Sequence, residues 1–146
     1  MWSRARIEPR FAPSYYQIGN VAGCQGKRSA AITAWEKTAS LAPGDQIAQC
    51  FLALACGLGD KPERAREILD SFTIRRANGY ASTGFIAIIH ASLLQIDEAF
   101  RWFEVAVKER DMSLTWVSLF KLWKGLEPLT TDPRFDRMLR TIGMET

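Results

Sequence analysis

Residues 46–79 read QIAQCFLALACGLGDKPERAREILDSFTIRRANG, and residues 80–113 read YASTGFIAIIHASLLQIDEAFRWFEVAVKERDMS. These two stretches decide the fold, because when they are aligned without a gap large residues match large ones and small residues match small ones. Residues 12–45 align in the same way, so the chain repeats with a period of 34 residues. A period of this length is typical of an array built from one supersecondary unit.

Two columns of the alignment hold only small residues, and each has bulky residues nearby. The small columns are Gly19, Ala53 and Ala87, and Ala31, Ala65 and Ala99; the bulky columns are Ile18, Leu52 and Ile86, and Trp35, Leu69 and Phe103. Two antiparallel helices approach closely only where a small side chain lies at their crossing. Each row therefore predicts one pair of helices, and successive pairs stack to share a continuous core.

The rest of the sequence also favours helices over strands. Apolar residues recur at spacings of three and four, and alternating β-branched runs are scarce. Turn-forming residues such as Pro43-Gly44 and Asn78-Gly79 interrupt these runs at short intervals. We therefore predict an all-α fold of helices roughly 10–14 residues long, joined by short turns.

The period and the small columns resemble the tetratricopeptide repeat family, whose repeat is 34 residues long. Pro43 also matches a column where that family favours proline. The resemblance implies a short solenoid of antiparallel helical hairpins closed by C-terminal capping helices. The expected organisation is a tail of a preceding, truncated repeat (1–11), three repeats (12–45, 46–79 and 80–113) and a capping region (114–146).

Both ends of the chain carry further signals. Pro9 lies 34 residues before Pro43, so residues 4–9 resemble the end of an earlier repeat. Residues 114–126 are predicted to form a helix, and Asp132-Pro133 is predicted to begin the last helix, with Asp132 or Thr131 as its N-cap. The stretch from Glu127 onward is similar to the ending of bacterial tetratricopeptide proteins, some of which are parts of transcriptional regulators, nucleotide cyclases and kinases.

Composition limits the class of protein. Hydrophobic residues make up 47% of the chain and charged residues 24%, which is typical of a globular protein, and the net charge of +3 is too small to indicate nucleic acid as a direct partner. Neither a signal peptide nor an apolar run of about 20 residues is present, so no membrane contact is expected. Three cysteines in a chain of this size favour a reduced, cytoplasmic protein.

Few residues carry catalytic or metal-binding chemistry. His90 is the only histidine, and Cys50 and Cys56 lie six residues apart, which is not a metal-binding or redox spacing. We interpret His90 and the cysteines as packing residues. The turn 26–29 and the basic stripe of Arg134, Arg137 and Arg140 are interpreted as solvated surface rather than phosphate sites. We therefore expect no enzyme activity, no cofactor and no metal.

The resemblance implies that the first helix of each pair lines a concave face. The residues expected to form a partner-binding groove on this face are Tyr16, Asn20, Phe51, Leu54, Leu58, Phe85 and Ile88. An apolar groove of this kind marks a contact site. Its occupant could be a partner peptide, the chain's own segment 114–144 or a second copy of the chain; alternatively, these residues pack between repeats and no groove exists.

The sequence therefore predicts a non-catalytic protein–protein interaction module. Binding would come from burial of the groove residues against a protein or peptide partner. Self-association is the leading variant, because Trp116, Phe120 and Trp123 add apolar surface beside the stack. The alternative is a C-terminal regulatory or sensory module of a bacterial transcriptional regulator or nucleotide cyclase.

Overall fold

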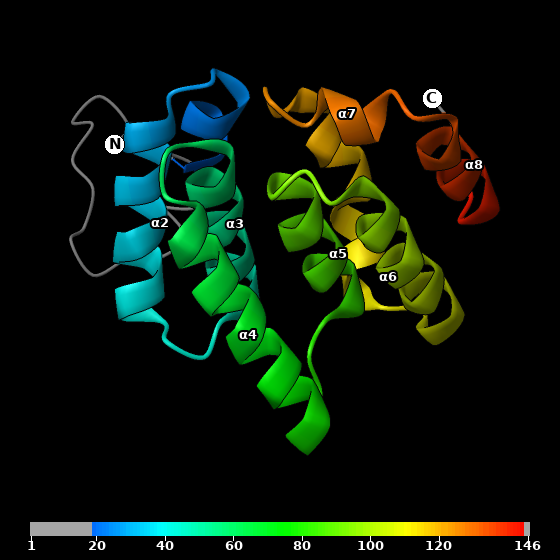
Figure 1. The fold of residues 1–146 in the computed structure, drawn as a ribbon, viewed down its shortest axis with the longest axis horizontal. Helices are drawn as coiled ribbons and strands as arrows, with labels where there is room; N and C mark the ends of the chain where they lie inside the picture. Colours follow the sequence, from blue (N-terminus) through cyan, green and yellow to red (C-terminus); the bar gives the residue numbers. More distant parts are fainter. Residues whose placement is uncertain (1–18, 145–146) are drawn as a thin grey trace, which may run out of the picture.

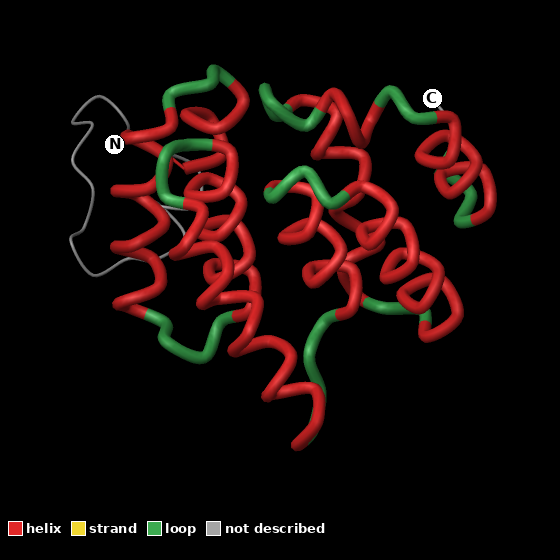
Figure 2. Tube along the Cα trace, in the orientation of Figure 1, coloured by secondary structure: helices red, strands yellow, loops and turns green. Residues whose placement is uncertain are grey.

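The computed structural model describes residues 19–144, and this part of the chain consists of helices and loops, with no strand. Figure 1 shows the helices packed side by side as successive antiparallel pairs, and Figure 2 shows that short loops connect them. Residues 19–24 are helical and precede α2 (Arg28–Leu41), α3 (Gln46–Leu58), α4 (Pro62–Asn78), α5 (Thr83–Ser92), α6 (Ile96–Glu109), the 3₁₀-helix η2 (Met112–Leu122), α7 (Glu127–Thr130) and α8 (Pro133–Thr141).

The helix ends follow local side-chain chemistry. Asp45 caps α3 by accepting a hydrogen bond from the backbone N–H of Ile47, and the Ser82 hydroxyl accepts one from Phe85 at the start of α5. Asp132 caps α8, and Pro133 occupies its first turn, as predicted. The helix α4 ends at Asn78, directly before the predicted Asn-Gly stop.

The helix α3 lies at the centre of the fold and packs against α2, α4 and α5, while α5 packs against α6 and η2. The small residues predicted at helix crossings are buried, and the five alanines among them are 0% exposed. A Cβ atom added to Gly19 would lie 2.4 Å from Nε1 of Trp35, so the helix that ends at residue 24 and α2 approach too closely for any larger side chain. The described helices therefore form close-packed pairs at the predicted positions.

The helix predicted over residues 114–126 is present as a 3₁₀-helix with different bounds. The structure has the 3₁₀-helix η2 over Met112–Leu122, followed by an extended Trp123. Its N-cap is Asp111, whose carboxylate accepts a hydrogen bond from the backbone N–H of Ser113. A 3₁₀-helix of 11 residues is unusually long, because this form rarely exceeds three or four residues. The path of η2 across the fold explains its length.

Candidate functional site

The predicted groove residues form part of the hydrophobic core. Phe51 and Leu54 on α3, and Phe85 and Ile88 on α5, are all 0% exposed. The two remaining described members of the set, Asn20 and Leu58, are partly buried. Tyr16 lies outside the described residues.

The chain's own η2 region covers this face. The Phe51 ring contacts three aromatic rings of that region, at centroid distances of 6.3 Å from Trp116, 5.8 Å from Phe120 and 5.7 Å from Trp123. On its other side Phe51 stacks on Trp35 of α2 at 4.9 Å. A side chain enclosed in this way is not available to an outside partner. Residues of the chain's own segment 114–144, one of the occupants considered above, cover this face.

We call residues 112–126 the cover segment. It crosses the first helix of each pair in turn. Near its beginning, Ser113 lies so close to α5 that a Cβ atom on Gly84 would be 2.7 Å from the Ser113 Cβ. Its middle contacts Phe51 on α3, and Trp123 reaches residues 19–24, where a Cβ atom on Gly23 would be 2.4 Å from the indole. The cover segment therefore contacts α5, α3 and residues 19–24 along its length.

The 3₁₀ conformation gives the cover segment the reach that this path requires. Neighbouring packed helices lie about 8–10 Å apart, so crossing from the first to the third requires roughly 16–20 Å. Ten residues rise about 20 Å as a 3₁₀-helix but only about 15 Å as an α-helix. An α-helix from Ser113 to Trp123 would be too short to contact all three helices, which gives a physical reason for the unpredicted geometry.

A buried carboxylate anchors the beginning of the cover segment. Asp111, only 6% exposed, accepts hydrogen bonds from the Tyr80 hydroxyl at 2.5 Å, the Ser82 hydroxyl at 2.5 Å and the backbone N–H of Ser113 at 3.1 Å. Burial raises the pKa of Asp111, but the hydrogen bonds from Ser113, Ser82 and Tyr80 outweigh burial, and the net pKa is lowered. Asp111 is therefore ionised at neutral pH and joins the loop before α5 to η2.

The same network raises the pKa of Tyr80 to about 12. Burial is the first cause, and the hydrogen bond that the phenol donates to Asp111 is the second. A tyrosinate in this position would face the Asp111 carboxylate and lose that hydrogen bond. The phenol therefore remains protonated far above neutral pH.

The cysteines lie in environments that favour the neutral thiol. Cys50 is fully buried with its Sγ 3.9 Å from the Phe85 carbonyl oxygen, and burial raises the pKa of its thiol well above the ordinary value. Burial also raises the pKa of Cys24 and Cys56. His90 lies with Nδ1 2.6 Å from the Gln95 side-chain oxygen. Within residues 19–144, no three metal-ligating side chains come together.

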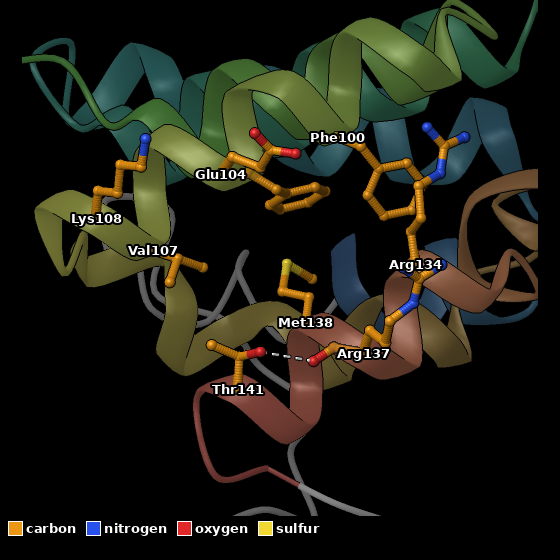
Figure 3. Close-up of a pocket in the computed structure, with 9 residues that line it drawn as sticks. Phe100, Glu104, Val107, Lys108, Arg134, Arg137, Met138 and Thr141 are labelled. Atoms are coloured by element: carbon orange, nitrogen blue, oxygen red, sulfur yellow. Dashed lines mark hydrogen bonds between the residues drawn. The ribbon is translucent and has the colours of Figure 1, made fainter.

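An open groove lies between α6 and α8 (Figure 3). It encloses about 390 Å³, a volume typical of binding pockets. Its floor is formed by Phe100 and Phe103 of α6 and by Met138 of α8, all of them nearly buried. A second cavity of about 410 Å³ shares Val107 and Thr141 with it and continues toward Leu114 and Ile142. We call the two together the α6–α8 groove.

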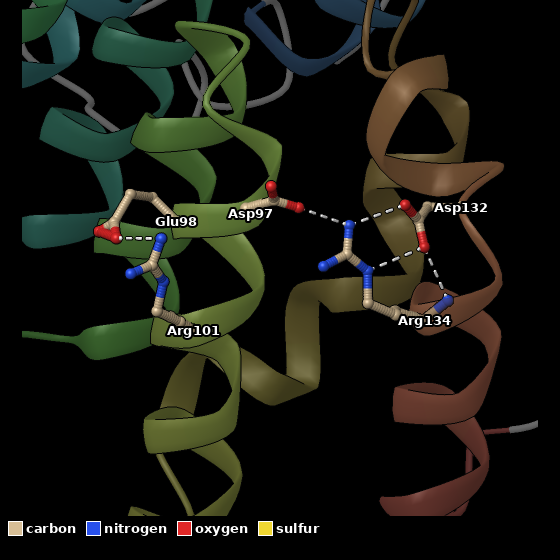
Figure 4. A network of polar contacts seen from close by, with 5 residues as sticks. All are labelled: Asp97, Glu98, Arg101, Asp132 and Arg134. Carbon is tan, nitrogen blue, oxygen red and sulfur yellow. Dashed lines mark hydrogen bonds and ion pairs between the residues drawn. The ribbon is translucent and has the colours of Figure 1, made fainter.

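Charged contacts fix α8 against its neighbours. Arg134 pairs with Asp132 and with Asp97 of α6, both at 3.0 Å (Figure 4). Its guanidinium also lies 4.4 Å from the centre of the Phe100 ring. Lys121 of η2 pairs with Asp136 of α8 at 3.2 Å. Exposed ion pairs contribute little stability individually. Here they join α8 to α6 and η2, and Arg134 also lines the groove.

Sequence reasoning missed the α6–α8 groove. In the sequence, Phe103 is only a member of a bulky column, and Arg134 and Arg137 are interpreted as solvated surface. Arg134 instead makes the two ion pairs described above. The apolar side of residues 133–141 was the available signal, because Phe135, Met138 and Leu139 are all buried.

Among residues 19–144, no helix combines the length and apolar character needed to cross a membrane. Comparison of the chain with protein-family models, with curated proteins and with solved structures finds no match.

Proposed function

We propose that this chain is a non-catalytic protein–protein interaction module built from tetratricopeptide-like helix pairs. The cover segment is the observation that carries the proposal. This long, aromatic-rich segment lies across helices α3 and α5 and residues 19–24. In the family that the sequence resembles, the corresponding helices form the face that holds partner segments. This face has the apolar chemistry needed to hold a peptide, and in this chain the cover segment occupies it.

The cost of releasing the cover segment supports partner binding outside the covered face. Val117, Phe120 and Trp123 of the cover segment are at most 1% exposed. Burying each such side chain contributes about 1.5–3 kcal/mol, so releasing the three costs roughly 5–9 kcal/mol. That cost approaches the total stability of an ordinary domain. A partner therefore binds on the surface that remains open, and the α6–α8 groove is the apolar concavity available there.

Site-specific photo-crosslinking in cells of the source organism tests the proposal. Thr141 is exposed and lines both cavities of the groove, so a photo-crosslinking amino acid in its place samples a bound partner directly. The matched control carries the same amino acid at Lys37, an exposed position on α2. We expect a discrete protein adduct from position 141 and none from position 37. Absence of any adduct, or the same adducts from both positions, would contradict the proposal.

A further inference from the structure

We propose that the α6–α8 groove recognises an acidic, apolar peptide segment of a partner protein. The inference rests on the proposed function and adds the chemistry of the partner. It follows from two properties of the groove, an apolar floor and a rim whose unpaired charges are mostly positive.

The floor requires apolar side chains from the partner. Phe100, Phe103 and Met138 are between 2% and 8% exposed, and Val107, Leu114 and Ile142 are partly buried along the same groove. The two cavities share Val107 and Thr141 in their linings, so they lie next to each other along α6 and α8. An apolar groove of this kind fits a peptide segment that offers several apolar side chains along one edge.

The rim selects the charge of the partner. Lys108, Arg110 and Arg137 line the two cavities, are exposed and form no ion pair with any described residue, whereas Glu104 is the only unpaired carboxylate among the lining residues. The other lining charges are already satisfied, because Arg134 pairs with two aspartates and the Asp111 carboxylate accepts three hydrogen bonds.

Stabilisation of helix ends does not account for all three cations. Lys108 and Arg110 lie at the C-terminal end of α6, where a positive charge complements the helix dipole. Arg137 lies in the middle of α8, which spans Pro133–Thr141, so the same explanation does not apply to it. Cations from two different helices that border one apolar groove favour an anionic partner and repel a cationic one.

The charge pattern also argues against the chain's own N-terminal region as occupant. Residues 1–18 contain three arginines, Arg4, Arg6 and Arg10, and a single acidic residue, Glu8. This segment has the same sign of charge as the rim. The occupant is therefore an acidic, apolar segment of another protein.

Fluorescence anisotropy with the full chain tests the inference. The probe is a fluorescein-labelled peptide that alternates Leu or Phe with Glu, and the matched peptide carries Lys in place of every Glu. We expect saturable binding of the acidic peptide only, and weaker binding as the salt concentration rises. We expect the double variant Lys108→Glu/Arg137→Glu to weaken that binding at least tenfold, and Thr141→Trp, which fills the groove without changing its charge, to abolish it.

The control variant Lys37→Glu/Arg66→Glu makes the same change in net charge at exposed positions of α2 and α4. It should bind the acidic peptide as the unmodified chain does. The inference is overturned if the acidic peptide fails to bind, if the Lys peptide binds equally well, or if the control loses as much affinity as the groove variant. Circular dichroism of each variant establishes that its fold is intact.

Failure of this inference can be separated from failure of the proposed function. If the photo-crosslinked adduct at position 141 forms equally well in the Lys108→Glu/Arg137→Glu background, the interaction function stands and the acidic preference is wrong. If the adduct has twice the mass of the chain, a second copy occupies the groove, and the inference of a foreign peptide is overturned.

Discussion

The substitution Phe51→Ala distinguishes a covered face from an open groove. Phe51 is 0% exposed and lies between Trp35 on one side and Trp116, Phe120 and Trp123 on the other. Truncation of a buried phenylalanine costs about 3–5 kcal/mol, because both the transfer energy and the packing around the new cavity are lost. Each aromatic pair adds about 0.5–1.5 kcal/mol. We therefore expect a loss at the upper end of the 3–5 kcal/mol range.

Urea unfolding followed by far-ultraviolet circular dichroism measures this loss. For a chain of this size, about 2–4 °C in Tm corresponds to each kcal/mol, so a loss of about 4–5 kcal/mol should shift thermal unfolding downward by roughly 8–20 °C. Ile74→Ala is the matched control, because Ile74 on α4 is 64% exposed and its truncation should change stability by less than about 0.5 kcal/mol. If Phe51→Ala costs no more than this control, the ring faces solvent and the covered face is refuted.

Three further predictions concern the anchor of the cover segment. Gly84→Ala should destabilise the chain by about 1–3 kcal/mol in urea unfolding because the new Cβ meets Ser113, although a glycine-to-alanine change inside a helix ordinarily stabilises it. A gain in stability would contradict the close approach of Gly84 to Ser113. Gly44→Ala is the control, because a Cβ atom at Gly44 would have nothing within 4 Å. Because the pKa of Asp111 is lowered in the folded state, its contribution to stability is present above its ordinary pKa and is lost as pH falls through the folded pKa. Asp111→Asn should remove this part of the decline of the urea midpoint at acidic pH. An unchanged pH dependence would be evidence against the hydrogen-bond network. Because the pKa of Tyr80 is raised to about 12 in the folded state, its contribution to stability is present below the ordinary pKa of about 10 and is lost as pH rises toward 12. Tyr80→Phe should therefore reduce the loss of stability at alkaline pH. A Tyr80 phenol that titrates near pH 10 in the native protein would disprove the hydrogen bond.

Much of the fold could be predicted because it depends on local and periodic signals. The apolar spacing indicated an all-helical fold, and the small columns of the alignment indicated residues that the structure buries, such as Gly19, which lies against Trp35. Asp132-Pro133 marked the start of α8 through capping chemistry that acts within a few residues. Signals of this kind depend on adjacent residues or on a fixed repeat, so they can be recognised without the tertiary structure.

The conformation and placement of the cover segment could not be predicted in the same way. Trp116, Phe120 and Trp123 have spacings that suit an α-helix, and only the distance across the first helices favours the 3₁₀ form. The resemblance identified Phe51 and Phe85 as residues of the concave face, but the pattern of the repeats contains no information on what covers that face. The α6–α8 groove was missed for a related reason, because it exists only where α8 is held against α6.

The proximity of Phe51 to the cover segment is the most direct test of the account. Nuclear Overhauser spectra of the full chain, with its aromatic residues isotopically labelled, measure that proximity in solution. The account predicts cross-peaks from the Phe51 ring to the rings of Phe120 and Trp123, whose centroids lie 5.8 and 5.7 Å away. Cross-peaks from the Phe51 ring to Trp35 alone, and none to residues 112–126, would contradict this prediction. They would mean that the predicted groove residues are open to a partner.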